Sequence, residues 1–273
     1  MKNSVEYHAD NLYKPSFFFN TMNLHYLSWP DSEKYLKKHV VLLPVGSLEQ
    51  HGLHNQLGCD FMIAEKLASA AASKKEILIC PPIPYGISKH HRHFFGTVWI
   101  EGETFKKYVL DVCLSLATHG AHKIIIVNGH GGNTSSLLEV VGEMRHGGVA
   151  CIIFEWWKVE GESFLEEGLF GKEFAKGGHA DAGETSVNMY LHPTLVDLKK
   201  ARDRDVVWSP KVHGGQFKVD TIDFTDIGSI GFPTKASHEA GKKIFENAVE
   251  ELTALIEWME KENVKNLLEK RHK

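Results

Sequence analysis

The chain has 273 residues, of which 42% are hydrophobic and 24% charged, as in a globular protein with a sizeable core. The formal net charge is −4 and Lys and Arg form no large cluster, so nucleic acid is not expected as the main partner. The apolar runs are too short to span a bilayer and no signal peptide pattern is visible, so we expect a cytoplasmic protein without a membrane segment. The four cysteines are widely spaced and form no C-x-x-C motif, so we expect them to be reduced.

Short β-rich segments alternate with longer helical patterns in the first half of the chain. Residues 39–46 (HVVLLPVG) predict a buried strand, and residues 60–75 carry apolar side chains at helical spacing. Residues 76–86 predict a second strand that ends in turn residues. A second helix is predicted over 104–120, ending at its glycine. Its apolar face consists of Phe105, Val109, Val112 and Leu116.

The second half of the chain continues the alternation. The predicted elements are a strand over 123–133, a helix over 133–147 capped by Asn133 or Thr134, a strand over 149–157, a helix from Glu184, and one long amphipathic helix over 242–273. Such alternation predicts right-handed β-α-β units and a mostly parallel sheet covered on both faces. No linker or repeat divides the chain, which favours a single domain.

Polar, histidine-containing segments follow the predicted strands. EQH (49–51), YGISKHHRH (85–93) and NGHGGN (128–133) follow the first three, and KGGHADAGETS (176–186) comes after the fourth. Ligands of an open parallel sheet bind outside the carboxyl ends of its strands, so we expect these segments to meet at one edge.

Five side chains in these segments have the chemistry of metal ligands: Glu49, His51, Asp60, His130 and Glu184. Glu49 and His51 are two residues apart, so an extended backbone points both the same way. Mixed carboxylate and imidazole ligands suit zinc, manganese or iron. Five are more than one tetrahedral catalytic ion needs, and they suit two cations that share a bridging carboxylate.

Each of these residues, taken alone, has another explanation. Glu-x-His can be a solvated strand end, and Asp60 can be a helix cap. The glycine-flanked His130 can lie in an ordinary turn or in an anion-binding nest, which would fit a nucleotide. Motifs typical of serine hydrolases, P-loop proteins, dinucleotide-binding proteins and H-E-x-x-H metalloproteases are absent. The combination at one sheet edge therefore favours a metal site.

The motifs PVGSLEQHGLHNQLGCD, PYGISKHH, NGHGGN, GGHADAGETS and GSIGFPTKAS occur in this order. Together they resemble the creatininase (creatinine amidohydrolase) family, from about Leu24 to the C-terminal helix. The resemblance implies one domain over 1–273, folded as a three-layer α/β/α sandwich with a dinuclear metal site and assembled as a homohexamer. Residues 1–23, which include Phe17-Phe18-Phe19, look like an N-terminal extension.

The resemblance also implies residue roles. Glu49 and His130 would hold one divalent ion, His51 and Glu184 the other, and Asp60 would bridge them. His179 corresponds to the proton-transfer residue of the family. Ser88 and His91 fall in the substrate loop of the family, and Trp157 corresponds to a substrate-facing tryptophan. Apart from the resemblance, the hydrolytic mechanism that we expect would use backbone N–H groups near Gly131 and Gly132 to stabilise the oxyanion.

Two departures from the family pattern concern the substrate. Creatininase itself has Tyr-Glu where this chain has Gly131 and Gly132, which argues against creatinine. Phe95 replaces the proline of F-P-G-T, and the segment KHHRH (89–93) is unusually polar and basic. That segment is either a solvated loop or part of a pocket for a hydroxyl-rich or anionic molecule.

The reaction we expect is metal-assisted hydrolysis, in which a water ionised by the two cations attacks a carbonyl carbon of a small molecule. The sharpest hypothesis is ring-opening C–C hydrolysis of a diketo-inositol such as 3-dehydro-scyllo-inosose. One alternative is an amidohydrolase that cleaves the C–N bond of a creatinine-like lactam or a formamidopyrimidine nucleotide. The other is a non-catalytic binding module that keeps a metal for stability.

Overall fold

The computed structural model describes residues 22–73, 77–159, 162–175, 177–206, 211–268 and 270. The predicted N-terminal extension, with Phe17-Phe18-Phe19, lies outside these residues apart from Met22 and Asn23. The centre of the fold is a parallel sheet with the strand order β1-β3-β2-β4-β5. Its strands are β1 (Met22–Asn23), β2 (Val41–Val45), β3 (Leu78–Ile79), β4 (Lys123–Asn128) and β5 (Ala150–Glu155). A separate antiparallel pair consists of β6 (Lys211–Val212) and β7 (Gly215–Gln216).

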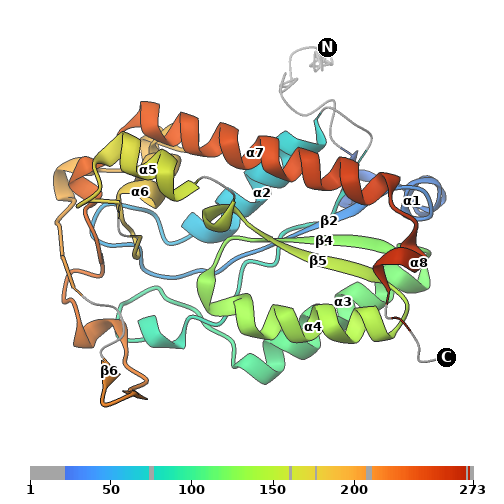
Figure 1. Cartoon of the computed structure of the whole chain (residues 1–273), viewed down its shortest axis with the longest axis horizontal. Helices are drawn as coiled ribbons and strands as arrows, with labels where there is room; N and C mark the ends of the chain where they lie inside the picture. Colours follow the sequence, from blue (N-terminus) through green and yellow to red (C-terminus); the bar gives the residue numbers. More distant parts are fainter. Residues whose placement is uncertain are drawn as a thin grey trace, which may run out of the picture.

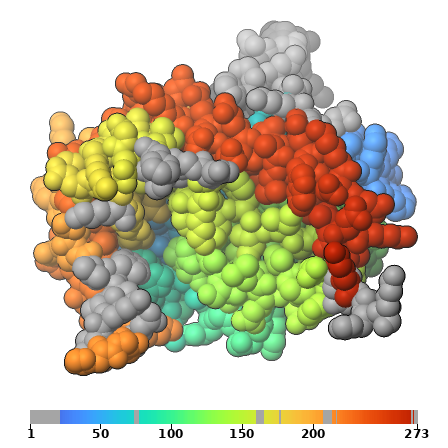
Figure 2. Space-filling view, viewed as in Figure 1, coloured from blue at the N-terminus to red at the C-terminus, as the bar shows by residue number. Residues whose placement is uncertain are grey.

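Helices cover both faces of the sheet (Figure 1). The helices are α1 (Trp29–Leu36), α2 (Cys59–Ala72), α3 (Gly102–Thr118), α4 (Thr134–His146), α5 (Glu162–Phe170), α6 (Ala182–Leu191), α7 (His238–Lys261) and α8 (Val264–Leu267). Side chains of a strand alternate between faces, so Leu42 packs in the core under α2 and α7 while Val41 and Leu43 pack in the core over α3 and α4. In the surface view, α7 (red) runs along the upper edge of the molecule, beside α5 (yellow) (Figure 2). The predicted three-layer α/β/α sandwich is confirmed.

The strand predicted over 76–86 is much shorter in the structure. Pro81, Pro82 and Pro84 have no N–H group to donate to a neighbouring strand, so regular pairing ends at Ile79. One isolated bridge, between Val45 and Ile83, continues the pairing beyond that point.

The prediction of a single helix over 242–273 is wrong about both helix ends. It begins earlier, at His238, because the side chain of Ser237 caps it by accepting the N–H of Ala240 at 3.1 Å. It ends at Lys261, and Asn263 then caps the short helix α8. On α3, Cys113 is buried where Val112 was expected, and Val112 is only half-buried.

The carboxyl ends of the central strands lie side by side. Val45 of β2 pairs with Asn128 of β4, which pairs with Glu155 of β5. The segments that follow these residues therefore start from one edge of the sheet, as predicted. None of the described helices is both long and apolar enough to cross a lipid bilayer.

Candidate metal centre

Asp60 lies between two imidazole rings. Its Oδ1 is 2.9 Å from Nε2 of His51, and its Oδ2 is 3.1 Å from Nδ1 of His130. All three residues are buried, with at most 6% of their surface exposed. Asp60 stands in the first turn of α2, but the N-cap of that helix is Gly58, so capping does not explain this carboxylate.

Backbone carbonyls fix the tautomers of both rings. Nδ1 of His51 is 3.1 Å from the carbonyl oxygen of Glu49, and Nε2 of His130 is 3.2 Å from that of Ile87. A carbonyl oxygen only accepts hydrogen bonds, so these nitrogens carry the proton and donate. The other nitrogen of each neutral ring, Nε2 of His51 and Nδ1 of His130, therefore carries a lone pair. Each lone pair then faces one oxygen of Asp60. Acceptors at this distance repel one another unless a positive charge lies with them, which a divalent cation at each nitrogen would supply.

The pKa shifts support the same reading. Burial opposes a charged ring at His51, but Cys59 and Asp60 raise its pKa well above the ordinary value. Burial also opposes charge at His130, yet Glu49 and Asp60 raise its pKa to about 9. Burial favours a neutral Asp60, while His51 and His130 lower its pKa. In the absence of a metal ion, the rings of His51 and His130 therefore retain protons, which supply the positive charge that the neighbouring carboxylates require.

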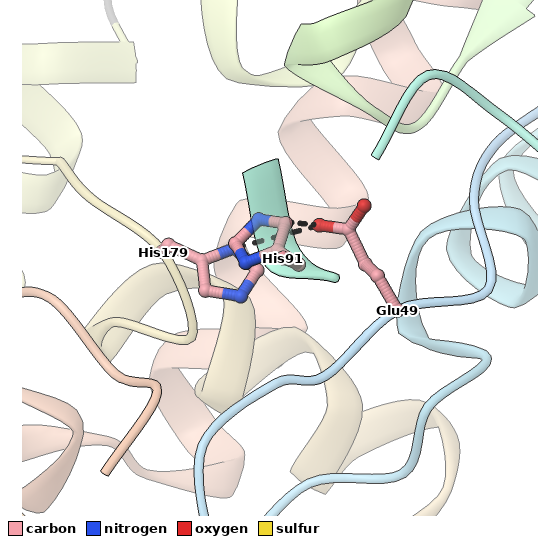
Figure 3. A group of neighbouring side chains, drawn as sticks. All are labelled: Glu49, His91 and His179. Carbon is pink, nitrogen blue, oxygen red and sulfur yellow. Dashed lines mark ion pairs between the residues drawn. The ribbon is translucent and has the colours of Figure 1, made fainter. Parts of the chain in front are cut away.

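Glu49 is completely buried beside this pair. Its Oε2 is 3.3 Å from Nε2 of His130. Its Oε1 is 3.2 Å from Nε2 of His91 and 3.7 Å from Nδ1 of His179 (Figure 3). Neither oxygen accepts a hydrogen bond from the described residues. A buried carboxylate without hydrogen bonds is costly unless a cation compensates it. The ligand atoms of Glu49, Asp60 and His130 lie within 4.8 Å of one another and could hold one ion.

Glu184 approaches the same nitrogen of His51 that Asp60 faces. Its Oε2 is 3.9 Å from Nε2 of His51 and accepts the N–H of Ala180 at 2.6 Å. Asp181 caps α6 by accepting the N–H of Glu184, and Ala180 has a left-handed φ of 50°, which turns the chain into the helix. Burial raises the pKa of Glu184 to about 8. Ligand atoms of His51, Glu184 and His179 form a second group within 4.8 Å.

His179 is held as a neutral ring that presents a lone pair to the cluster. Its Nε2 donates to the carbonyl of Gln50 at 2.7 Å, which leaves Nδ1 as an acceptor facing Glu49. Its backbone pairs with Ile230 in both directions. Burial, followed by the charges of His91 and His51, lowers its pKa well below the ordinary value.

A cavity of about 590 Å³ opens beside these ligands. Of the residues predicted to contact substrate, His91, Gly131, Gly132 and Trp157 line it. Ser88 is buried and is not among the described residues that line the cavity, so its role stays a prediction. Trp156, Glu166 and Lys218 also line the cavity and were not predicted.

The basic segment 89–93 only partly lines this cavity. His90 and His91 reach it, whereas Lys89 pairs with Glu101 at 2.5 Å. Arg92 and His93 both pair with Asp220. The cationic side chains are therefore neutralised away from the cavity, and the segment contributes imidazoles to it.

Sequence reasoning missed the residues that orient the ligands. The side chain of Asn128 accepts the N–H of His130 at 3.1 Å and donates to its carbonyl at 2.9 Å. Asn133, predicted as a helix cap, instead donates to the carbonyl of Gly46 and accepts the N–H of Ile87. The only signal was their position inside NGHGGN, which predicts a turn and no specific contact.

Gly131 and Gly132 offer a matched pair of substitutions. An added Cβ at Gly132 would lie 2.4 Å from Nε2 of His130 and 2.4 Å from the carbonyl of Ile87, whereas nothing lies within 4 Å at Gly131. We expect Gly132→Ala to displace His130 and weaken metal affinity by ~10–100-fold, because orienting contacts have effects of this size. Competition with a fluorescent chelator measures the metal affinity of each variant. Gly131→Ala is the control, and equal affinity in both variants would contradict the expectation.

The metal-free protein is expected to lose stability as the pH rises from 6.5 to 9. The folded pKa of His130, about 9, lies above its ordinary 6.5, so its stabilisation is complete below 6.5 and is lost as pH rises through 9. The raised pKa of Glu184 has the same sign, since the fold favours its neutral form. The shift in the pKa of His130 corresponds to a decrease in the free energy of unfolding on the order of 3 kcal/mol across this pH range.

Thermal unfolding in chelator at both pH values measures this loss. Metal-loaded protein is the control and should change less, because bound cations replace the protons. A metal-free protein that is equally or more stable at pH 9 would contradict the prediction.

Comparisons with known proteins agree with this geometry. A family model described as creatininase, creatinine amidohydrolase, matches residues 25–256. The chain is 29% identical to the creatinine amidohydrolase of Pseudomonas putida over 228 residues, which cover 77% of this chain and 86% of that protein. It is 30% identical to the mycofactocin precursor peptide peptidase of Mycobacterium ulcerans over 227 residues, covering 79% and 84%. Identity to the 3-dehydro-scyllo-inosose hydrolase of Thermotoga maritima is 26% over 267 residues, covering 89% and 81%.

Solved structures show the same fold. A crystal structure of creatinine amidohydrolase superimposes with a TM-score of 0.75 at 25% identity, covering 89% of this chain and 99% of that one. A creatininase mutant of Zn-Zn type has a TM-score of 0.74 at 27% identity, covering 87% and 98%. A manganese form of creatininase gives 0.74 at 25% identity, covering 88% and 99%.

Proposed function

This chain belongs to the creatininase family, and we propose that it is a hydrolase that binds two divalent cations and cleaves a bond next to a carbonyl group of a small molecule. The observation that supports it most is the arrangement of Asp60 between two ring nitrogens that backbone carbonyls hold as lone pairs. Zinc and manganese, the ions of the related creatininase structures, both suit this carboxylate and imidazole set.

Each cation would have its own ligands. Glu49 and His130 would hold one and His51 and Glu184 the other. Asp60, whose two oxygens face His51 and His130, would be shared between them. When bound, the cations supply Lewis acidity that polarises a carbonyl group and favours ionisation of water near neutral pH.

The chain's own residues position the substrate and move the proton. Trp157 forms a wall of the cavity, and the N–H groups near Gly131 and Gly132 stabilise negative charge on the carbonyl oxygen. Nδ1 of His179 accepts the proton of the attacking water as its oxygen bonds to the carbonyl carbon. His179 then returns that proton to the leaving nitrogen or carbon when the C–N or C–C bond breaks.

Among substrates we favour a diketo-inositol such as 3-dehydro-scyllo-inosose. The similarity to the 3-dehydro-scyllo-inosose hydrolase spans 89% of this chain, against 77% for creatinine amidohydrolase. The cavity volume of about 590 Å³ suits a small molecule, and His90, Glu166 and Lys218 offer polar contacts to a hydroxyl-rich ring beside Trp157.

An amidohydrolase is the second candidate. The relatives that cleave C–N bonds, creatinine amidohydrolase and the mycofactocin precursor peptidase, are 29% and 30% identical to this chain. A non-catalytic binding module is the third candidate, and it predicts bound metal with no turnover.

From the resemblance to the creatininase family we also propose that the chain forms a homo-oligomer, a hexamer of 30.7 kDa chains. Light scattering measures the mass of this assembly.

A substrate panel tests the proposal. Zinc-loaded and manganese-loaded protein is assayed with 3-dehydro-scyllo-inosose, creatinine, a formamidopyrimidine nucleotide and a mycofactocin precursor peptide, with chelated protein as the control. We expect the highest kcat/KM for the inosose. Preference for a nitrogen substrate would overturn the inosose assignment and keep the hydrolase, whereas no metal-dependent turnover of any carbonyl compound would overturn the hydrolase itself.

A further inference from the structure

Gln50 and its neighbours fix the tautomer of His91. Nδ1 of His91 is 2.8 Å from Nε2 of Gln50 and 2.8 Å from Oγ1 of Thr221. The carboxamide of Gln50 is itself oriented by two backbone groups, because its Oε1 accepts the N–H of Gly52 at 2.9 Å and its Nε2 donates to the carbonyl of Gly228 at 3.0 Å. An amide NH₂ group only donates, so Nδ1 of His91 accepts and carries no proton.

The proton of the neutral His91 ring is therefore on Nε2. This N–H group belongs to a residue that is only 1% exposed, and it has no hydrogen-bond partner among the described residues. Nε2 is 3.2 Å from Oε1 of Glu49, but the N–H is not directed along a hydrogen bond to that oxygen. A buried donor without an acceptor costs free energy, and a ligand in the cavity that His91 lines would remove this cost by accepting from Nε2.

His91 thus differs from three neighbouring imidazoles of the ligand cluster. His51, His130 and His179 each donate to a backbone carbonyl and present a lone pair, whereas His91 presents an N–H. A metal ligand needs a lone pair, so His91 cannot use Nε2 as a ligand in this tautomer, although it stands beside Glu49 and His179 in a ligand-like group (Figure 3).

Gln50 gives the two neighbouring rings opposite roles. Its backbone carbonyl holds His179 as an acceptor, and its side chain holds His91 as a donor. The ring centroids are 4.2 Å apart, and both rings line the cavity with Gly131 and Gly132. A hydrogen-bond donor, Nε2 of His91, and a proton acceptor, Nδ1 of His179, thus lie at 3.2 Å and 3.7 Å from the same oxygen of Glu49, on two residues that line the cavity.

We propose that His91 is a catalytic residue that donates its Nε2–H to the substrate carbonyl oxygen as negative charge develops there, and that Gln50 is the positioning residue that fixes this tautomer. The inference rests on the proposed hydrolase function and deepens it. This donor would add to the N–H groups near Gly131 and Gly132, two residues that line the same cavity.

Two substitutions separate the donor from the ring. His91→Gln keeps an N–H near the position of Nε2, and His91→Asn has none there. We expect kcat of His91→Asn to fall by ~10²–10³-fold, the usual loss for one such donor, while KM and the two cations per chain stay unchanged. His91→Gln should recover at least about tenfold of that loss.

Three results would overturn the role of His91. Loss of metal from both variants would make it a ligand. A kcat of His91→Asn within about threefold of wild type would remove it from catalysis, since one donor is worth ~10²-fold or more. Equal losses of kcat in both variants at full metal content would assign the effect to the ring and not to the N–H group.

A second readout does not depend on turnover. ¹⁵N NMR of histidine-labelled, zinc-loaded protein reports the protonation of each ring nitrogen, and we expect a proton on Nε2 of His91 and none on Nδ1. A proton on Nδ1, or a zinc-bound Nε2, would overturn the inference. Wild-type protein inactive on every substrate would contradict the proposed function instead, and the NMR result would still decide the tautomer.

Discussion

Asp60→Asn is expected to lower kcat/KM by at least ~10³-fold, because the cations it would help to hold supply several kcal/mol of stabilisation and each 1.36 kcal/mol is tenfold in rate. Asparagine has nearly the same shape but no charge, and it cannot offer one anionic oxygen to each side. Oδ1 and Oδ2 face His51 and His130 separately, so both half-sites lose a ligand. We therefore expect metal content to fall together with activity, as measured by elemental analysis.

Asp111→Asn is a matched control, since Asp111 is exposed on α3, outside the cavity. Circular dichroism should show that both variants are folded. An Asp60→Asn protein that keeps both cations and its activity would show that this carboxylate does not bridge them.

His179→Asn is expected to lower kcat by ~10²–10⁴-fold while the metal content stays at the wild-type value. Nδ1 of His179 faces the ligand cluster as a neutral acceptor, and asparagine can form a hydrogen bond there but cannot carry a proton. KM should change little, because the side chain acts on the proton and not on substrate affinity.

His54→Gln is the control for this variant. His54 is equally buried and bonds to Thr185, and it is not among the described residues that line the cavity. Its substitution should leave kcat nearly unchanged. If His179→Asn instead loses a cation in proportion to its activity, His179 is a metal ligand, in keeping with its place in the group with His51 and Glu184.

Much of the fold and of the candidate site was predictable from the sequence. The strand 41–45 and the centre of the strand 123–128 are continuous apolar runs, which are typical of buried parallel strands. Because parallel strands end at one edge, the polar segments after them had to meet, and Glu49, Asp60 and His130 lie together as expected.

What the sequence did not predict depends on contacts between distant residues. The sequence suggested no role for Gln50, between Glu49 and His51. In the structure Gly228 helps to orient its side chain, which in turn fixes the tautomer of His91. Thr221 contacts the same ring from 130 residues away. The ends of helices were also not predicted from the spacing of apolar residues. The break after Lys261 depends on one residue, Asn263, which caps the next helix.

Elemental analysis of the purified chain, paired with activity before and after chelation, tests the central claim most directly. We expect two divalent cations per chain, loss of activity when a chelator removes them, and its return when zinc or manganese is added. A chain that is free of metal and fully active, or that reaches full activity with one ion, would contradict a site built around a carboxylate shared by two cations.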